Sequence, residues 1–261
     1  MINSDFIDQM REATKRKVGL LDNHFIKFAL RSLYAGVFLS FATVCAILAA
    51  GLLYDINPIL SKFIYAIIFP FALIMIVTMN AELATSNMMY MSVAVHQKFI
   101  NIKKGLQLII VCTSFNWLGA ILAVYLMSFA TSSDQFANQA FLMNLIQAKL
   151  EKSNLSLFIE AILANMFVNI AIIGQLKIQN EIAKFFFIEI LIFMFAFLGY
   201  EHVVANFSIH SIAFFKGHFL PYGTVLSQWF LAFFGNLVGG GILIGVIYSF
   251  LNSNTINQLD K

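Results

Sequence analysis

The sequence has few charged residues, and this decides its class. Asp, Glu, Lys and Arg make up 11% of its 261 residues, whereas a soluble domain carries roughly 25%. Hydrophobic residues reach 60%, and 29 residues are Phe. Water could not accommodate so much apolar surface, so lipid is the expected solvent. The net charge of +3 is small and dispersed along the chain, which argues against a nucleic-acid partner.

Cysteine and histidine are also scarce, and their placement excludes most cofactor chemistry. The two cysteines, Cys45 and Cys112, lie inside apolar runs, where buried free thiols are expected rather than a disulfide. No second histidine or cysteine lies at metal-ligand spacing from His202. We therefore expect neither a metal nor an organic cofactor.

The N-terminus lacks the pattern of a cleavable signal. It opens with a polar stretch that carries Arg11, Lys15, Arg16 and Lys17, and no small-residue cleavage site follows a short apolar core. Apolar residues recur within this stretch at helical spacing. Residues 1–25 are predicted to form an amphipathic cytoplasmic helix at the membrane surface.

Long apolar runs dominate the rest of the chain. A helix needs roughly 20 residues to cross the hydrocarbon core, and six segments are long enough. They are Phe28–Leu53, Phe63–Val95, Leu106–Thr131, Leu155–Leu176, Phe185–Phe215 and Leu226–Leu251. We therefore predict an all-α membrane protein with a six-span pore domain at 26–252 and a short cytoplasmic tail at 253–261.

The connecting loops differ in charge. With the N-terminus inside, all but four of the 16 Lys and Arg residues lie on the inner side. The four outer ones are Lys62, Lys149, Lys152 and Lys216. This positive-inside bias predicts cytoplasmic N- and C-termini in a plasma-membrane protein.

The second and fifth segments are too long for one plain span, and polar residues interrupt both. Asn80 and Glu82 lie at mid-membrane in the second segment, and Glu201, His202 and Asn206 lie there in the fifth. Polar groups at this depth usually face a cavity or a partner. Irregular backbone is tolerated there only where protein or a water-filled lumen covers it. Each segment is therefore predicted to be two half-helices joined by a loop.

The chain also repeats itself. Glu82–Asn87 matches Glu201–Asn206 at an offset of 119 residues (201 − 82), and Asn116–Gly119 matches Asn236–Gly239 at an offset of 120 (236 − 116). Each repeat holds three spans, so the two halves must cross the membrane in opposite orientations. Such inverted repeats with broken helices place a substrate site near the midplane.

Four stretches carry a resemblance to a known family. They read FPFALIMIVTMNAELATSN, ILANMFVNIAI, YEHVVANFSI and FFGNLVGGGILIG, in that order along the spans. With them the chain resembles the formate/nitrite transporter family. The resemblance implies an aquaporin-like fold, a homopentamer with one pore in each protomer, and a transporter rather than an enzyme.

The resemblance also implies roles for particular residues. His202 matches the central pore histidine, Thr85 the threonine that approaches it, and Lys149 the vestibule lysine with Asn165 as its asparagine partner. Glu201 would lie behind the histidine and orient the loop. The predicted substrate pathway comprises His202, Lys149, Asn165, Thr85, Leu83, Ala84, Glu201 and Asn206.

Two positions depart from the family pattern. Ala84 stands where the family commonly has Phe, and Asn80 replaces a more usual glycine. If Ala84 lines the constriction as that Phe does, the passage is wider there.

Other polar residues are given structural roles. Glu82 and Glu201 are predicted to accept from the orphan N–H groups of the broken helices, and Asn87 and Asn206 to cap the second half-helices. Lys149 is placed in an outer loop, and His210 on a helix face near the exit. The glycines of the sixth segment (Gly235, Gly239, Gly240 and Gly241) are predicted to allow close helix packing.

The favoured function is proton-linked transport of formate, acetate or lactate, without a catalytic residue. A lysine attracts the anion, the apolar funnel raises its pKa, and the neutral acid crosses. A nitrite or hydrosulfide channel of the same fold is the main alternative. Two further hypotheses are an integral membrane enzyme that uses Glu82, Glu201 and His202, and a purely structural pentamer. The resemblance also implies that residues Met1–His24 plug the inner mouth at low pH.

Overall fold

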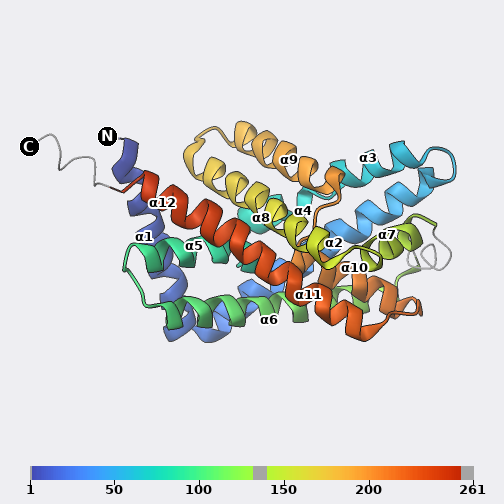
Figure 1. Ribbon diagram of the computed structural model, residues 1–261, viewed down its shortest axis with the longest axis horizontal. Coiled ribbons are helices and arrows are strands. Elements are labelled where there is room, and N and C mark those ends of the chain that lie inside the picture. The colour runs from blue at the N-terminus through green and yellow to red at the C-terminus, as the bar shows by residue number, and fades with distance from the viewer. Residues whose placement is uncertain (1, 132–139, 254–261) are drawn as a thin grey trace, which may run out of the picture.

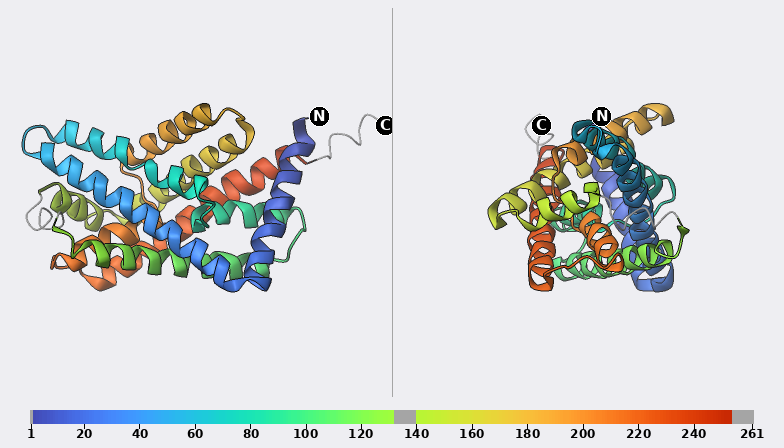
Figure 2. Two further views of the ribbon diagram at one scale, coloured as in Figure 1. Left: turned by 180° about the vertical axis from the view of Figure 1, so that it is seen from behind. Right: turned by 90° about the vertical axis from the view of Figure 1, so that its right-hand side faces the viewer.

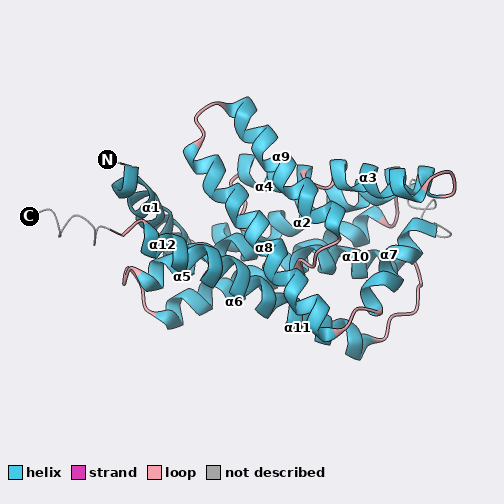
Figure 3. Ribbon diagram, turned by 45° about the horizontal axis from the view of Figure 1, so that its top comes forward, coloured by secondary structure: helices cyan, strands magenta, loops and turns pink. Residues whose placement is uncertain are grey.

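The computed structural model describes residues 2–131 and 140–253, and within these ranges it consists of helices and loops without strands (Figures 1 and 3). The all-α membrane class predicted from hydropathy is confirmed. The predicted tail at 253–261 lies outside the described residues, apart from Ser253.

The N-terminal helix α1 spans Ile2–Asn23 and packs across one end of the helix bundle. The Arg11 guanidinium lies 4.8 Å from the ring centroid of Phe99, and Lys104 binds Asp22 at 2.7 Å. Lys17 reaches inward and pairs with Glu82. These contacts hold α1 against the loop at Phe99, the start of the helix Ile102–Met127 and the helix break at Glu82.

Within residues 2–131 and 140–253, five helical stretches are long and apolar enough to cross a membrane, and a bent pair raises the number to six. The five are α2 (Phe25–Tyr54), α3 with α4 (Pro58–Ile68 and Phe71–Thr78), α6 (Ile102–Met127), α8 (Asn154–Lys177), and α11 (Tyr222–Asn236) continuing through η2 (Leu237–Val246) and α12 (Ile247–Leu251). The bent pair is α9 (Glu181–Leu198) and α10 (Val203–Phe215), which meet at 57°.

Both predicted helix breaks are present. In the second segment, α4 ends at Thr78 and α5 (Ala84–His96) begins after a short extended loop. The backbone turns at Asn80 (φ 53°) in the first break and at Gly199 (φ 74°) in the second. Glycine and asparagine are the residues that most readily adopt this left-handed conformation. Asn80 therefore adopts the left-handed backbone conformation that glycine would adopt at this position.

The helix α7 (Ala140–Leu150) was not predicted, and the placement of Lys149 in a loop is wrong. Phe141, Leu142 and Ile146 bury one face of this helix in the bundle. With 11 residues, α7 is too short to cross a bilayer. It lies at the opposite end of the molecule from α1 (Figures 1 and 2).

The predicted close packing of the sixth segment is confirmed. η2 is a π-helix of 10 residues that packs against α8. A Cβ atom on Gly239 would collide with the backbone carbonyl of Ile162, and one on Gly240 with the amide of Asn165. Only glycine allows the two backbones to approach this closely.

Candidate functional site

The two loop regions at the helix breaks meet near the centre of the molecule. The Thr85 hydroxyl, in the first turn of α5, lies 2.8 Å from Nε2 of His202, the N-cap of α10. Nδ1 of His202 accepts a hydrogen bond from the Ala205 N–H at 3.3 Å. In a neutral imidazole the proton is then on Nε2, which donates to the Thr85 oxygen. The Thr85 O–H is left to donate to a third group.

Two buried asparagines, equivalent in the repeat, fasten these loops. Oδ1 of Asn116 accepts from the Ala84 N–H at 2.9 Å, and Oδ1 of Asn236 accepts from the Val203 N–H at 2.9 Å. Their amide groups donate to the carbonyls of Glu82 and Glu201 at 2.9 and 3.0 Å. Each asparagine therefore satisfies two polar groups where the loop meets the second half-helix, namely a loop carbonyl and the first helical N–H, as a buried broken helix requires.

The predicted capping roles of Asn87 and Asn206 are wrong. Their amides donate to the side chains of Glu82 and Glu201, at 3.0 and 2.8 Å. The N-cap of α5 is Leu83 and that of α10 is His202.

The two carboxylates likewise accept from lysines rather than from free helix N–H groups. Lys17 of α1 binds Glu82 at 2.5 Å, and Lys149 of α7 binds Glu201 at 2.8 Å. All four side chains are almost fully buried. Lys17 was missed by the sequence analysis, which assigned it to a membrane-surface cluster. Both lysines lie in a helix that precedes the first span of its repeat. They are 132 residues apart (149 − 17), which differs from the repeat offset of 119, so the spacing of the repeat did not reveal Lys17.

Lys149 also has a different asparagine partner from the one the resemblance implied. Its ammonium group donates to Oδ1 of Asn206 at 2.9 Å, and only 6% of the residue is exposed. The amide of Asn165 instead donates to the Thr85 carbonyl at 3.1 Å and to the Asn236 carbonyl at 2.7 Å. Asn165 thus joins the central loops to the sixth span.

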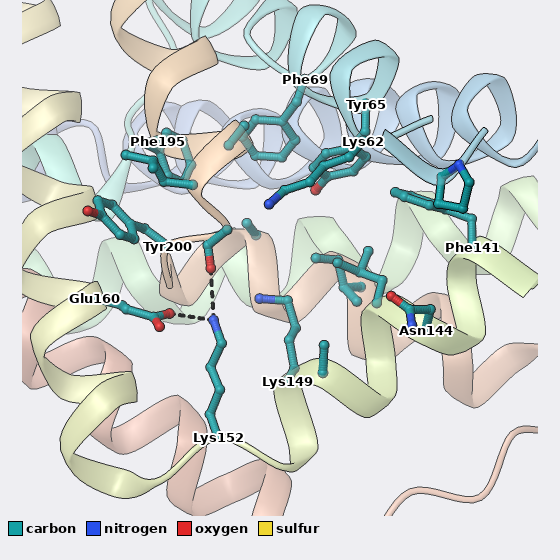
Figure 4. Close-up of a pocket in the computed structure, with 18 of the residues that line it drawn as sticks. Lys62, Tyr65, Phe69, Phe141, Asn144, Lys149, Lys152, Glu160, Phe195 and Tyr200 are labelled. Atoms are coloured by element: carbon teal, nitrogen blue, oxygen red, sulfur yellow. Dashed lines mark hydrogen bonds and ion pairs between the residues drawn. The ribbon is translucent and has the colours of Figure 1, made fainter. Parts of the chain in front are cut away.

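A second lysine, Lys152, shares the Glu201 carboxylate. It donates to Oε1 of Glu201 at 2.6 Å and to the Gly199 carbonyl at 2.8 Å. It also donates to Glu160 (Figure 4). Burial lowers the pKa of Lys149 despite the attraction of Glu201. For Lys152 the burial penalty is outweighed by Glu201 and Glu160, which raise its pKa above the usual lysine value.

Two hollows share part of their lining, and the smaller one lies beside His202. A cavity of about 370 Å³ is lined by Lys149, Lys152 and several aromatic side chains (Figure 4). A void of about 20 Å³ lies next to His202. Phe69 and Phe195 line both spaces, with ring centroids 5.5 Å apart in an edge-to-face arrangement. This ring pair separates the charged cavity from the apolar void.

Leu83, rather than Ala84, lines this void. Ala84 is fully buried, and its N–H is bound to Asn116. The widening predicted at Ala84 therefore has no support at this constriction.

Two remaining predictions are also revised. His210 is buried at 2% exposure, and its Nδ1 accepts from the Trp229 indole at 2.9 Å, so it is an interior residue rather than one on a face near the exit. Both cysteines are free, but only Cys112 is buried; Cys45 is exposed.

The described residues contain no group of three His, Cys, Asp or Glu side chains that could hold a metal ion.

Comparisons with known proteins show the family of the chain. A family profile described as "Formate/nitrite transporter" matches residues 4–250. The chain is 32% identical over 215 residues to the uncharacterized transporter YrhG of Bacillus subtilis (strain 168), covering 78% of this chain and 80% of that protein.

Two solved structures share the fold. A structure titled "FNT family ion channel" superposes with a TM-score of 0.87 at 21% identity, covering 95% of this chain and 99% of that one. A structure titled "Pentameric formate channel with formate bound" gives a TM-score of 0.70 at 21% identity, covering 87% and 96%. This multi-pass membrane protein therefore belongs to the formate/nitrite transporter family, whose members are transporters of small anions and not enzymes.

Proposed function

We propose that the protein carries out proton-linked transport of small monocarboxylates, with formate as the first candidate and acetate and lactate as larger ones. The observation that carries this proposal is the His202–Thr85 hydrogen bond beside an apolar void, reached from a lysine-lined cavity. One end of the route attracts anions, and its middle admits only species that have lost their charge.

The lysine-lined cavity would collect the anion. Lys149 and Lys152 place two ammonium groups in its wall, and positive charge focused in a cleft raises the local anion concentration. Their carboxylate partner Glu201 holds them in place. Lys149 has two hydrogen bonds to protein side chains, and an ammonium group has three donors, so one donor is available to an entering carboxylate.

The ring pair would select the neutral form. Moving a carboxylate from water past Phe69 and Phe195 strips its hydration, which penalises the charged form and raises its pKa. Protonation yields a neutral acid, for which an apolar constriction costs far less. The net result is movement of one anion together with one proton.

At the centre, His202 and Thr85 would position the acid. Because the His202 Nε2–H donates to the Thr85 oxygen, the Thr85 O–H is directed away from the ring and can donate to a carboxyl group. Thr85 thus offers one donor beside the void, whose lining residues other than His202 are apolar side chains such as Leu83 and Val168. A single donor orients an acid without holding it tightly, which suits a transport route.

The assembly and orientation are proposed on similar grounds. A homopentamer with one pore per protomer is supported by the fold shared with a structure titled as a pentameric formate channel. The basic residues of α1 support a cytoplasmic helix over residues 1–25 below the pore domain at 26–252. With this orientation the Lys149 cavity faces outward in the plasma membrane and Lys17 lies at the inner mouth.

A nitrite or hydrosulfide channel is the second candidate. Nitrite is supported by the family description, and it is also a small monovalent weak-acid anion that the same route would accept. Hydrosulfide has the same charge and proton chemistry. The void of about 20 Å³ argues for the smallest of these solutes over lactate.

Uptake into proteoliposomes tests the proposal. We expect labelled formate to enter faster with the outside at pH 5.5 than at pH 7.5, because more of the acid is neutral and the proton gradient points inward. Labelled lactate in the same vesicles reports the size limit, and a pH electrode records proton movement. Formate influx without accompanying alkalinisation outside, or equal influx at both pH values, would contradict proton linkage.

A further inference from the structure

The cavity outside the ring pair is far larger than the solutes proposed to pass it. Its volume of about 370 Å³ compares with about 20 Å³ for the void at His202. Pockets of roughly 300–1,000 Å³ hold ligands of drug size. Its walls include six aromatic side chains, Tyr54, Tyr65, Phe69, Phe141, Phe195 and Tyr200. A formate ion would leave most of this apolar wall uncovered.

The charges around the cavity are unevenly compensated. Lys149 and Lys152 are ion-paired with Glu201, and Lys152 also with Glu160, so these two cations are balanced by two carboxylates. Lys62 also lines the cavity, and no carboxylate lies within ion-pair distance of it among the described residues. Its ammonium group instead lies over the face of Phe197, with Nζ 5.1 Å from the ring centroid. Lys62 therefore supplies the unbalanced positive charge of this cavity.

Figure 4 places this charge where a ligand could reach it. Lys62 extends into the cavity from α3, close to Tyr65 and Phe69, while Lys149 enters from α7 on the opposite side. An anionic group at Lys62 would therefore have aromatic rings beside it and, across the cavity, the free donor of Lys149.

We propose that this cavity is a binding site for aromatic monoanions, with the acid group at Lys62 and the ring against Tyr65, Phe69 and Phe141. A benzene ring would cover apolar wall that a small solute leaves wet, and burial of apolar surface stabilises binding. Edge-to-face contacts with the aromatic wall add to this. The ring cannot follow formate between Phe69 and Phe195, so the bound anion blocks the route. Blocking rests on the proposed function, whereas binding does not.

Benzenesulfonate is a suitable probe because it stays ionised at every pH at which the protein is folded. It can cross neither the bilayer nor a neutral-acid route. Added outside proteoliposomes, it should inhibit formate uptake competitively, and methanesulfonate, which lacks the ring, should inhibit at least about tenfold less well. Lys62→Gln should weaken inhibition by about tenfold, as expected for losing a charge-assisted bond. Lys62→Arg should retain it.

Lys216→Gln is the matched control, because Lys216 is another of the four outer lysines but lines a different, much smaller hollow. It should leave inhibition unchanged. Equal loss in Lys62→Gln and Lys216→Gln would reduce the effect to general surface charge and overturn the assigned site. Equal potency of the two sulfonates would remove the role of the aromatic wall.

A binding measurement separates this site from the transport proposal. Fluorine NMR of 4-fluorobenzenesulfonate with the purified protein should show line broadening that Lys62→Gln reduces. Binding of 4-fluorobenzenesulfonate without formate flux would contradict the proposed function but support the binding site at Lys62. Formate flux with no binding to the wild-type protein would overturn the site alone.

Discussion

At the scale of single residues, the most demanding features are two buried ion pairs. Lys17–Glu82 and Lys149–Glu201 lie at equivalent places in the two repeats, each with an asparagine donating to the carboxylate. The free-energy cost of removing two charges from water can equal the gain from their mutual attraction. A buried ion pair is therefore weak evidence for stability by itself. Here each pair joins a flanking helix, α1 or α7, to the loop of a broken span, which fixes the half-helix start at which Thr85 or His202 lies.

Breaking the inner pair should be costly. Glu82→Gln leaves the Lys17 ammonium buried without its counter-charge, and we expect a loss of about 3–5 kcal/mol in the free energy of unfolding. Combining it with Lys17→Met removes the stranded charge and should recover most of that loss. Thermal unfolding in detergent measures all three proteins.

The exposed pair Lys15–Glu12 provides the control for this cycle. Its side chains are 66% and 70% exposed, so Lys15→Met should change stability by less than about 1 kcal/mol. A Glu82→Gln protein as stable as the Lys15→Met protein would show that Lys17 escapes to water and that the pair does not fasten α1.

At the scale of helices, much of the fold follows from the sequence. The six apolar segments, the breaks in the second and fifth, and the inverted repeat all depend on local hydropathy and spacing. The helix α7 was missed because its 11 residues are too few for the length criterion applied to spans. The extra interruption between α3 and α4 was also missed; it falls at Pro70, which cannot donate a backbone hydrogen bond.

The sequence predicted which residues form the site better than it predicted their hydrogen-bond partners. His202 and Thr85 were expected to meet, and they do. The partners that cap the broken helices lie more than 30 residues away in the chain, at Asn116 and Asn236, whereas local reasoning assigned the nearest asparagines. Lys17 was missed for a related reason, since one lysine in a basic cluster has no local sign of burial.

The contact between η2 and α8 makes a second prediction at this scale. Gly239→Ala places a methyl group against the Ile162 carbonyl, and because backbone cannot move aside cheaply, overpacking should cost about 1–3 kcal/mol. Gly223→Ala, near the start of α11, adds the same methyl group to open space and should be neutral or slightly stabilising. Thermal unfolding in detergent compares the two. Equal stability of both variants would show that the helices separate without penalty.

At the scale of the whole molecule, the two halves share a framework but differ at its centre. Position 83 corresponds to position 202 (83 + 119), and these hold Leu83 and His202. Thr85 corresponds in the same way to Val204. The framework of glutamate, asparagine and lysine is thus duplicated, whereas each half contributes one member of the central polar pair. A route with a single histidine and a single threonine therefore needs both halves.

The inverted repeat also requires that Lys17 of the first half and Lys149 of the second half lie toward opposite sides of the membrane. This can be tested by cysteine labelling in a protein whose exposed Cys45 has been replaced by Ala; Cys112 is buried and should not react. The two positions to be changed to Cys are Asn144, an exposed residue of α7 that lines the Lys149 cavity, and Lys15, an exposed residue of α1. A membrane-impermeant maleimide should label Asn144→Cys in intact cells and Lys15→Cys only in inside-out vesicles. Labelling of both from the same side would contradict the inverted arrangement. Exchange of the two patterns would preserve that arrangement and reverse the orientation, which would place the Lys62 cavity at the cytoplasmic mouth.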